Sequence, residues 1–464
     1  MFRVAVIGSG PSGVYTAQSL VEQETVPDIE VYVLDRLPCP YGLVRYGVAP
    51  DHEKIKSLQN NLRTVLEHPR VHFLGNVEVG APGLGLKELR EIFHAVVFCV
   101  GAAADRQLGI PGEDLPGSHP ATGFVSWYSA HPDAAATRFS LAARSAIVIG
   151  VGNVAVDVAR ILSRGAAQLT TTDMPQGPLG ALADSRVEDV WMVGRRGPSQ
   201  AKFTTKELRE LGSLPGTEVL VRPKELALDP AYREPGDLPA VRRRNIEVLR
   251  GWAERDGTER ALAGTAAAGA TPPRRLHLRF FLRPVAMIGD AATGVRAVRF
   301  ERTVPDGLGG VTGTGEYEDI QGQLVLRSVG YRGTPQPGLP FDEATGTVPH
   351  RAGRVLRNDA AHPGVYVAGW IKRGPTGVIG TNRPCAKETA ASLLDDAAAL
   401  AERTLTEDPV SALIRAGQQP VPWTGWLGIE AAEAAWGRRL GRGTVKLPDW
   451  TRLLEAARTG AEVG

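Results

Sequence analysis

The chain has 464 residues, a formal net charge of +2, 43% hydrophobic residues and 22% charged residues. This composition is typical of a globular protein of about two to four domains and excludes bulk disorder and a fibrous repeat. The charge is too balanced to indicate a nucleic-acid partner, and no apolar run reaches the ~20 residues of a membrane span. Cys39, Cys99 and Cys385 lie far apart, which excludes a CxxC redox pair, a four-cysteine iron–sulfur cluster and a zinc ribbon. No signal peptide fits the first residues, so we expect a cytoplasmic protein. We also expect no bound metal.

Hydrophobic runs and glycine turns predict a strand, a turn, a helix and a strand at the N-terminus, and a similar unit further along. In the first unit we expect strands at 3–7, 30–34 and 94–100, helices at 14–23 and from about 51 to before Pro69, and an irregular loop at 37–50. In the second unit we expect strands at 146–149, 190–193, 277–282, 295–300 and 323–328, and helices at 154–162 and 203–211. A strand at 364–368 and a helix from about 382 follow.

Two other segments differ in composition from these units. The run at 255–275 is low in complexity, so we expect a surface excursion there. The tail beyond Asp408 is too apolar for a free tail, and we expect it to dock on the body. It contains Trp423, Trp426, Trp436 and Trp450.

A glycine-rich motif, Gly8-Ser9-Gly10-Pro11-Ser12-Gly13, lies between the first predicted strand and the first predicted helix. In such a GxGxxG turn, glycine permits a tight bend and a close approach of the backbone to a diphosphate at the helix N-terminus. Asp35 ends the following strand, where an acid binds a ribose hydroxyl. The motif therefore predicts a dinucleotide site, with Gly8, Gly10, Pro11 and Asp35 among its residues.

A second motif, Gly150-Val151-Gly152-Asn153-Val154-Ala155, again connects a strand to a helix. Its following strand ends in Arg195 and Arg196 instead of an acid. Two guanidinium groups suit a 2′-phosphate, whereas an acid suits a 2′-hydroxyl, so this site predicts NADP rather than NAD. Two dinucleotide sites in one chain indicate a flavin together with a nicotinamide, with the hydride passing to flavin N5.

Longer motifs then identify a family. The run 40–52, PYGLVRYGVAPDH, strongly resembles the adrenodoxin reductase family of NADPH–ferredoxin reductases. The resemblance continues through Gly112-Glu113-Asp114, the segments 195–198 and 203–210, and the long run 369–382, GWIKRGPTGVIGTN. It covers nearly the whole chain.

The resemblance implies an α/β fold with two Rossmann-like dinucleotide-binding domains, arranged as in glutathione reductase. The NADP domain, 106–330, would be inserted into a discontinuous FAD domain, 1–105 and 331–464. It implies FAD contacts from Ser12, Asp35, Leu43, Arg45, Val79, Trp370, Gly377, Val378 and Ile379. It implies NADP contacts from Arg106, Gly152, Asn153, Val154, Ala155, Arg195, Arg196 and Glu207. The family often has Glu where this chain has Asp35, and the shorter side chain weakens the expected ribose contact.

By the same match His52, Asp157 and Glu210 lie around the nicotinamide and flavin rings, where they either relay protons or fix the ring geometry. The expected activity is FAD-dependent electron transfer from NADPH to a ferredoxin-type iron–sulfur protein, with electrons released singly. An acidic ferredoxin would dock on basic residues, for which the match indicates Arg209, Arg242, Arg243 and Arg244. A flavin monooxygenase and an electron-transfer subunit of a larger complex remain as alternatives.

Overall fold

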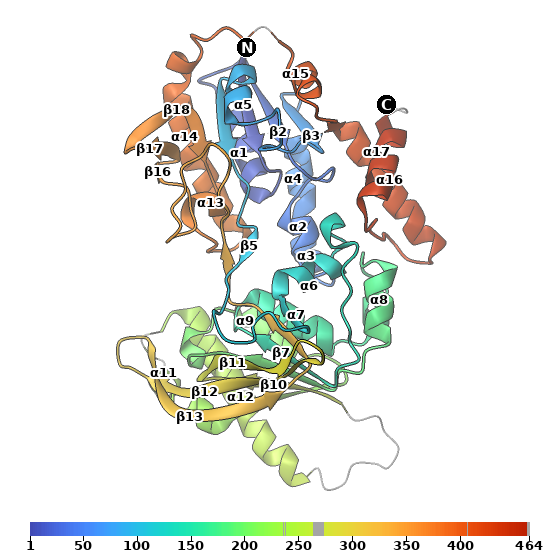
Figure 1. Cartoon of the computed structure of the whole chain (residues 1–464), viewed down its shortest axis with the longest axis vertical. Helices are drawn as coiled ribbons and strands as arrows, with labels where there is room; N and C mark the ends of the chain where they lie inside the picture. The colour runs from blue at the N-terminus through green and yellow to red at the C-terminus, as the bar shows by residue number, and fades with distance from the viewer. Residues whose placement is uncertain (235, 237, 263–272, 406, 462–464) are drawn as a thin grey trace. The chain divides into compact units, whose positions relative to one another are not determined.

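In the computed structural model (Figure 1), which describes residues 1–234, 236, 238–262, 273–405 and 407–461, the chain divides into two units. The first unit comprises Met1–Arg106, Ser129–Ala135 and Gly330–Gly464, and the second comprises Gln107–Tyr128 and Ala136–Val329. The second is thus inserted into the first. This arrangement confirms the predicted α/β fold class.

Ser129–Ala135 belongs to the first unit, although it lies within the range 106–330 of the predicted NADP domain, whose bounds stay a prediction. Its polar groups are paired within the first unit. The buried Lys446 ammonium donates to the Ser129 carbonyl at 3.2 Å. The Asp133 carboxylate pairs with Arg36 at 2.5 Å and accepts the Trp450 indole N–H at 2.9 Å. These partners lie far away in the sequence, so no local pattern could reveal them.

The first unit contains an eight-stranded sheet of order β16-β17-β18-β4-β1-β2-β3-β19. Its five central strands, from β18 to β3, pair in parallel. The strands of the sheet are β1 (Phe2–Ile7), β2 (Ile29–Leu34), β3 (Val71–Gly75), β4 (Ala95–Phe98), β16 (His350–Arg351), β17 (Arg354–Arg357), β18 (Ala360–Val367) and β19 (Val421–Pro422). A separate antiparallel pair joins β5 (Ala104–Asp105) and β15 (Tyr331–Arg332).

Helices cover this sheet because its central strands are apolar on both faces. The described helices of the unit are α1 (Pro11–Val21), α2 (Leu43–Tyr46), α3 (Glu53–Lys56), α4 (Leu58–Leu66), α5 (Leu86–Ile92), α13 (Trp370–Arg373), α14 (Asn382–Leu400), α15 (Pro409–Arg415), α16 (Trp423–Arg439) and α17 (Trp450–Ala461), with short 3₁₀ turns η1 (Pro132–Ala134) and η5 (Ile379–Thr381). The segment 37–50, predicted to be an irregular loop, contains the helix α2. The prediction missed this helix because α2 has only 4 residues.

The C-terminal tail packs on the first unit, as predicted. α16 and α17 lie side by side (Figure 1). Trp426 is 2% exposed and, with Ile429 and Leu453, belongs to the same hydrophobic core as β1 and β2. Burial of this apolar surface is the main force that holds the tail in place.

A buried ion pair connects the tail to α2. The Arg45 guanidinium lies 2.6 Å from the Glu433 carboxylate, with side chains 5% and 2% exposed. The same guanidinium stacks over the Trp426 ring at 5.0 Å. Lys446 donates to the Arg45 carbonyl at 2.6 Å, so the backbone of α2 is also held from the tail.

The second unit contains a six-stranded parallel sheet of order β6-β14-β7-β8-β10-β9 and a three-stranded antiparallel sheet, β11-β12-β13. The strands are β6 (Ser118–Pro120), β7 (Ser145–Ile149), β8 (Asp189–Val193), β9 (Thr217–Val221), β10 (Arg274–Arg279), β11 (Leu282–Asp290), β12 (Gly294–Pro305), β13 (Val311–Gln321) and β14 (Leu324–Arg327). The described helices are α6 (Ala121–Tyr128), α7 (Asn153–Ser163), α8 (Gln176–Ala183), α9 (Thr205–Leu211), α10 (Pro223–Leu226), α11 (Pro230–Arg233) and α12 (Ala240–Leu262), with 3₁₀ turns η2 (Ala166–Leu169) and η3 (Pro198–Gln200). Part of the predicted low-complexity excursion, 263–272, lies outside the described residues.

The single strand predicted at 277–282 is wrong, because the chain changes sheets inside it. β10 ends at Arg279 and β11 begins at Leu282. Phe281 between them has a φ of +58°, which is rare for a residue with a side chain. Its N–H donates to the Arg196 carbonyl and its carbonyl accepts from Thr303, so the turn is fixed on both sides.

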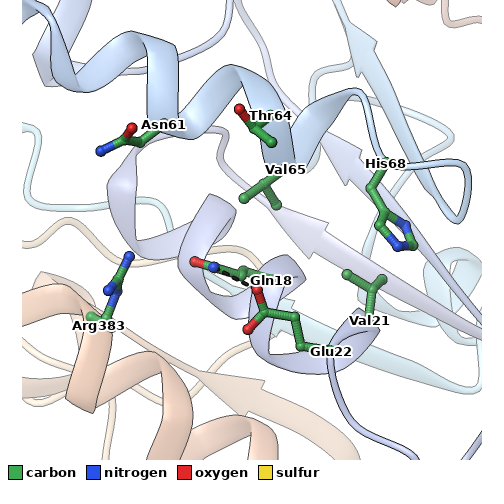
Figure 2. Close-up of a pocket in the computed structure, with 8 residues that line it drawn as sticks. All are labelled: Gln18, Val21, Glu22, Asn61, Thr64, Val65, His68 and Arg383. Atoms are coloured by element: carbon green, nitrogen blue, oxygen red, sulfur yellow. Dashed lines mark hydrogen bonds between the residues drawn. The ribbon is translucent and has the colours of Figure 1, made fainter.

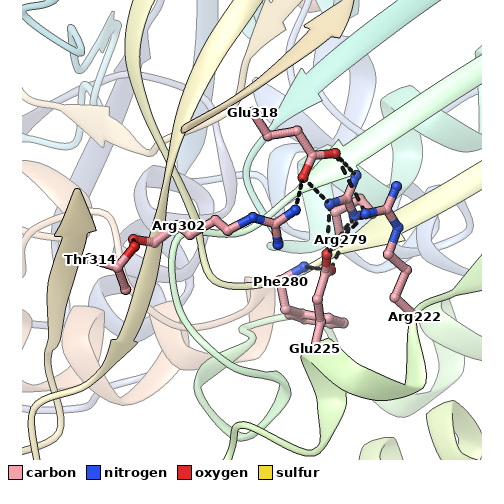
Figure 3. A network of polar contacts seen from close by, with 7 residues as sticks. All are labelled: Arg222, Glu225, Arg279, Phe280, Arg302, Thr314 and Glu318. Atoms are coloured by element: carbon pink, nitrogen blue, oxygen red, sulfur yellow. Dashed lines mark hydrogen bonds and ion pairs between the residues drawn. The ribbon is translucent and has the colours of Figure 1, made fainter. Parts of the chain in front are cut away.

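A buried arginine connects the two sheets of the second unit (Figure 3). Arg279 on β10 is 1% exposed and pairs with Glu225 of α10 at 2.6 Å and with Glu318 of β13 at 2.9 Å. The more exposed Arg222 and Arg302 also pair with Glu318. The central guanidinium therefore joins β10, α10 and β13 through charge-assisted hydrogen bonds.

No helix among the described residues is long and apolar enough to cross a membrane.

Removal of the Glu433 charge should destabilise the first unit. In Glu433→Gln the buried Arg45 loses its counter-charge, which costs about 3–5 kcal/mol for a pair of this kind. That corresponds to a fall of roughly 6–20 °C in the melting temperature followed by tryptophan fluorescence. The matched control is Glu430→Gln, whose partner Arg63 is 37% exposed, and which should change stability by less than about 1 kcal/mol. Equal effects of the two substitutions would contradict this assignment.

Candidate functional site

The first glycine turn, between β1 and α1, leaves no room for side chains. Gly8 has a φ of +106°, and a Cβ there would lie 2.7 Å from the Cys99 carbonyl oxygen. A Cβ at Gly13 would lie 1.8 Å from the Gly8 carbonyl oxygen. Gly10 caps α1 and Pro11 occupies its first turn. The turn thus directs the N-terminal N–H groups of α1 to one point, which is the geometry that binds a diphosphate.

Two further segments of the first unit reach this turn. A Cβ at Gly42 would lie 2.9 Å from Gly10 Cα, and a Cβ at Gly369 would lie 2.4 Å from Ser12 Oγ. The Ser12 hydroxyl is buried and has no hydrogen-bond partner among the described residues. A buried hydroxyl without a partner is costly, so it fits a bound polar group such as a phosphate oxygen.

Asp35 closes the first turn from the end of β2. Its carboxylate accepts the Ser9 N–H at 2.8 Å, the Ser9 hydroxyl at 2.5 Å and the Leu37 N–H at 2.9 Å. Burial raises the pKa of Asp35, and its hydrogen bonds to Ser9 and Leu37 only partly offset this effect. Asp35 orders the loop, and its expected contact with a ribose stays a prediction.

The predicted flavin residues include two apolar side chains that the protein leaves exposed. Leu43 at the start of α2 is 45% exposed, and Val378 is 61% exposed. Val378 and Ile379 precede α14, in the turn where Gly377 has a φ of +83°. Exposed apolar groups at these positions fit the edge of a planar ring system. Trp370 in α13 packs on Tyr331, with 5.4 Å between ring centroids.

Three other predicted cofactor residues of the first unit have partners within it. Arg45 pairs with Glu433, as described above. Val79 is partly buried against the core on one face of the sheet. Arg106, predicted to contact NADP, is an exposed residue at the end of β5 whose Nε donates to the Tyr331 carbonyl at 3.2 Å. Their cofactor contacts stay predictions.

The second glycine turn repeats the first between β7 and α7. Gly150 has a φ of +139°, and a Cβ there would lie 2.1 Å from the Ser328 carbonyl oxygen. At Gly152, by contrast, a Cβ would meet nothing within 4 Å. The space above Gly152 therefore fits a group that approaches the N-terminus of α7, where Asn153, Val154 and Ala155 form the first turn.

Arg195 and Arg196 follow β8 and have no ion pair among the described residues. Arg195 is exposed and Arg196 is partly buried. Burial lowers the pKa of Arg196, and the charges of Arg195 and Arg242 lower it further. Three mutually repelling cations with no protein carboxylate to neutralise them fit the binding of a strongly anionic group such as a phosphate.

α9 carries a carboxylate that also lacks a partner. Glu207 is 7% exposed, and its Oε2 is buried without a hydrogen-bond partner among the described residues. The N–H of Thr204, which caps α9, donates to Asn153 Oδ1 at 2.9 Å. This bond fixes α9 beside the second glycine turn, so Glu207 fits an acceptor for hydroxyl or amide groups of the coenzyme.

The structure brings two of the three candidate catalytic residues together. Asp157 and Glu210 both pair with Arg160, at 2.9 and 2.6 Å. His52 belongs to the first unit, is 5% exposed and caps α3, where its carbonyl accepts the Ile55 N–H at 3.0 Å. The roles of His52, Asp157 and Glu210 in catalysis stay predictions.

A cavity of about 320 Å³ in the first unit lies apart from these residues (Figure 2). It is lined by residues of α1 and α4, with Arg383 of α14 at its side, and the figure shows Gln18 bonded to Glu22. None of the predicted cofactor residues lines it. The cavity is therefore not the predicted flavin site.

Comparison with known proteins places this architecture in a family. The chain matches the pyridine nucleotide-disulphide oxidoreductase family over residues 2–192. It is 42% identical to the NADPH-ferredoxin reductase FprA of Mycobacterium tuberculosis, over 98% of each chain. It is 40% identical to the mitochondrial NADPH:adrenodoxin oxidoreductase of Homo sapiens, over 97% of this chain and 91% of the human one. The solved structure of M. tuberculosis FprA in complex with NADPH aligns with a TM-score of 0.88 at 42% identity, over 99% of each chain.

The chain belongs to the family of NADPH–ferredoxin and NADPH:adrenodoxin reductases. The resemblance read from the sequence motifs is thus confirmed. Cys39, Cys99 and Cys385 are free, so the chain has no disulfide of the kind that the broader family name mentions.

Sequence reasoning missed the contacts of three residues that lie near the predicted site residues. Gly42 is the glycine of the predicted flavin loop that touches Gly10. Arg242 affects the pKa of Arg196, although its run indicated a docking surface. Arg160 joins Asp157 to Glu210. The position of Arg160 three residues after Asp157 on a helix was a local signal for the first of its two ion pairs.

Gly152→Ala should fold normally and bind NADPH poorly. Gly152 has ordinary backbone angles, and its Cβ would point into open space, so the melting temperature should change little. The added methyl group occupies the path of the diphosphate, and KM for NADPH should rise by about tenfold or more. Gly150→Ala is the matched control: its φ of +139° and its contact with Ser328 predict a loss of stability instead. An unchanged KM in Gly152→Ala would contradict the site.

Proposed function

We propose that the site residues assembled above carry electrons from NADPH through FAD to an acidic ferredoxin-type iron–sulfur protein. The family membership makes the chain an FAD-dependent oxidoreductase of the NADPH–ferredoxin reductase type, with FAD and NADP(H) as cofactors. The observation that carries the residue assignment is the pair of glycine turns with opposite surroundings. Asp35 follows β2, the strand after the first turn, whereas Arg195 and Arg196 follow β8, the strand after the second turn.

FAD, when bound, supplies an acceptor for the two electrons of a hydride and a donor of single electrons. Oxidation of one NADPH to NADP⁺ therefore reduces two iron–sulfur proteins by one electron each and releases one proton. The protein has to bind both dinucleotides, orient their rings and hold the charges around them.

Residues of the first unit would hold FAD. The N–H groups at the start of α1 and the unpaired Ser12 hydroxyl would bind its diphosphate. Asp35 would accept a ribose hydroxyl. Leu43 and Val378 would pack on the flavin, which would cover their exposed apolar surface.

Residues of the second unit would hold NADPH. The space above Gly152 and the first turn of α7 would take the diphosphate, and Arg195 and Arg196 would take the 2′-phosphate. The unpaired Oε2 of Glu207 would accept a hydrogen bond from the coenzyme. Asp157 and Glu210 would lie by the nicotinamide, and His52 by the rings, where each orients a ring or moves a proton.

The docking surface would use basic residues at one end of the second unit. Arg209, Arg242, Arg243 and Arg244 are all exposed. Arg243 donates to the Gly236 carbonyl at 3.4 Å. Because Arg242 acts electrostatically on Arg196, we assign ferredoxin docking mainly to Arg209, Arg243 and Arg244. A cytoplasmic location is part of the proposal.

The reaction is tested by mixing the holoprotein, NADPH and an acidic ferredoxin without oxygen. We expect a yellow protein with one non-covalent FAD per chain that reduces two one-electron ferredoxins per NADPH. With NADH the rate at low coenzyme concentration should fall, because the two arginines then lack the phosphate. A flavin monooxygenase would instead consume oxygen and hydroxylate a product. A subunit of a larger complex would pass no electrons to free ferredoxin, and either result would overturn the proposal.

Charge reversal separates docking from coenzyme binding. Arg243→Glu with Arg244→Glu should raise KM for ferredoxin by roughly tenfold and leave KM for NADPH almost unchanged. Replacement of Arg195 and Arg196 by Gln should do the opposite. Exposed charges are screened beyond roughly 8 Å at physiological salt, so ferredoxin reduction should also fall steeply with ionic strength, while a small neutral acceptor should not respond. If the Arg243 and Arg244 variant keeps its KM for ferredoxin, these residues do not form the docking surface.

A further inference from the structure

Arg160 is a buried charge with an unusual pair of partners. It lies in the second half of α7, and its side chain is 1% exposed. One terminal nitrogen lies 2.9 Å from Asp157 Oδ1, one turn earlier on the same helix. The other lies 2.6 Å from Glu210 Oε2 on α9. A single guanidinium therefore holds carboxylates from two helices.

A second contact also fixes α9 to α7. The first is the bond from the Thr204 N–H to Asn153 Oδ1, where both helices begin. The contact between Arg160 and Glu210 lies about two helical turns further along both helices. Asp157 and the unpaired Glu207 lie between the two contacts, so the helix segment that would face the coenzyme is held at both ends.

The exposure of the partners shows on which side the cluster opens. The Asp157 and Glu210 side chains are 14% and 31% exposed, whereas the arginine between them is 1% exposed. The cation thus lies beneath the two carboxylates and holds them at the surface of the unit. The cluster around Arg279 is more enclosed, since its partners Glu225 and Glu318 are 5% and 20% exposed.

Among the described residues, charged groups on several elements packed against α7 surround this cluster, including the exposed Arg209 of α9. Lys206 on α9 lies 3.8 Å from Glu210 and is 53% exposed, so solvent weakens its effect. Glu207 is the nearest further acid on α9. Arg274 of β10 donates to the carbonyls of Leu162 and Arg164 at the far end of α7. β7 and α6 contain no charged residue, and the Asp189 carboxylate of β8 is paired with Arg275 and His277.

We propose that Arg160 is a positioning residue of the coenzyme site, which holds the Asp157 and Glu210 carboxylates in fixed directions beneath the nicotinamide. Without the guanidinium, two carboxylates would face each other at short range, and their repulsion would push the ionisation of one of them toward neutral pH. A fixed pair of negative charges would favour the positively charged oxidised nicotinamide, and hence loss of hydride from NADPH. The inference rests on the proposed place of Asp157 and Glu210 by the coenzyme.

The test replaces Arg160 by Met, which keeps the length of the side chain and removes its charge. The rate of flavin reduction by saturating NADPH is followed by stopped flow between pH 5.5 and 9. We expect a rate lower by up to about 100-fold and an ionisation near neutral pH that the wild-type profile lacks. Arg160→Met with Glu210→Gln leaves one carboxylate and should lose this ionisation. Arg160→Lys keeps the positive charge but lacks the two terminal nitrogens that contact the two carboxylates. It should restore the wild-type pH profile at a reduced rate.

A second readout does not depend on turnover. Calorimetric titration with NADP⁺ in buffers of different ionisation enthalpy measures the protons exchanged on binding. In Arg160→Met the positive ring should drive a proton off the carboxylate pair near pH 7, whereas the wild type should release none from it.

Arg279→Met is the matched control. It breaks a cluster of the same chemistry in the same unit (Figure 3). It should lower the melting temperature to a similar degree without a new ionisation in flavin reduction or in NADP⁺ binding. If Arg160→Met follows the wild-type pH profile, or if the double variant keeps the new ionisation, the inference is wrong. If the wild type itself passes no hydride to FAD, the proposed function fails instead.

Discussion

Both units depend on one constraint, a turn between a strand and a helix in which backbone atoms approach so closely that only glycine fits. At Gly13 a Cβ would overlap the Gly8 carbonyl, and at Gly150 a Cβ would overlap the Ser328 carbonyl. Once these contacts exist, α1 and α7 each begin directly beyond the carboxyl end of a parallel sheet. The first N–H groups of each helix then point at the same place relative to its sheet. The sheets, the covering helices and the C-terminal tail hold these two turns in position.

The two turns differ in charge although they share a frame. In the first unit Asp35 accepts the N–H and hydroxyl of Ser9, so an acid stabilises the loop itself. In the second unit the corresponding strand ends in Arg195 and Arg196, which have no protein carboxylate to neutralise them among the described residues. The Asp35 carboxylate stabilises the first loop, whereas the loop after β8 carries an excess of positive charge. This difference is consistent with the prediction that the first frame binds a flavin dinucleotide and the second a coenzyme with an additional phosphate.

Sequence patterns predicted what local interactions determine. The strands before both turns, the helices after them and the charge at Arg195 and Arg196 follow from hydrophobic periodicity, glycine and position. Contacts between distant segments could not be predicted this way. Ser129–Ala135 joins the first unit through Lys446 and Trp450, and Glu433 pairs with Arg45 from nearly the other end of the chain. The bend at Phe281 was missed because a positive φ at a phenylalanine has no sequence signal and depends on its hydrogen bonds to Arg196, which follows β8, and to Thr303 of β12.

Three buried arginines show how similar chemistry serves different ends. Arg45 pairs with a carboxylate that is 2% exposed, and the nearer partner of Arg279 is 5% exposed. These pairs lie inside their units, where loss of either partner leaves an uncompensated charge, and they specify which elements pack together. The partners of Arg160 are 14% and 31% exposed, so that part of each carboxylate remains available. Burial of the cation alone, beneath acids that still reach the surface, leaves the negative charge directed outward. Arg45 and Arg279 each have at least one partner that is 5% exposed or less, although Glu318 beside Arg279 is 20% exposed, whereas both partners of Arg160 reach the surface.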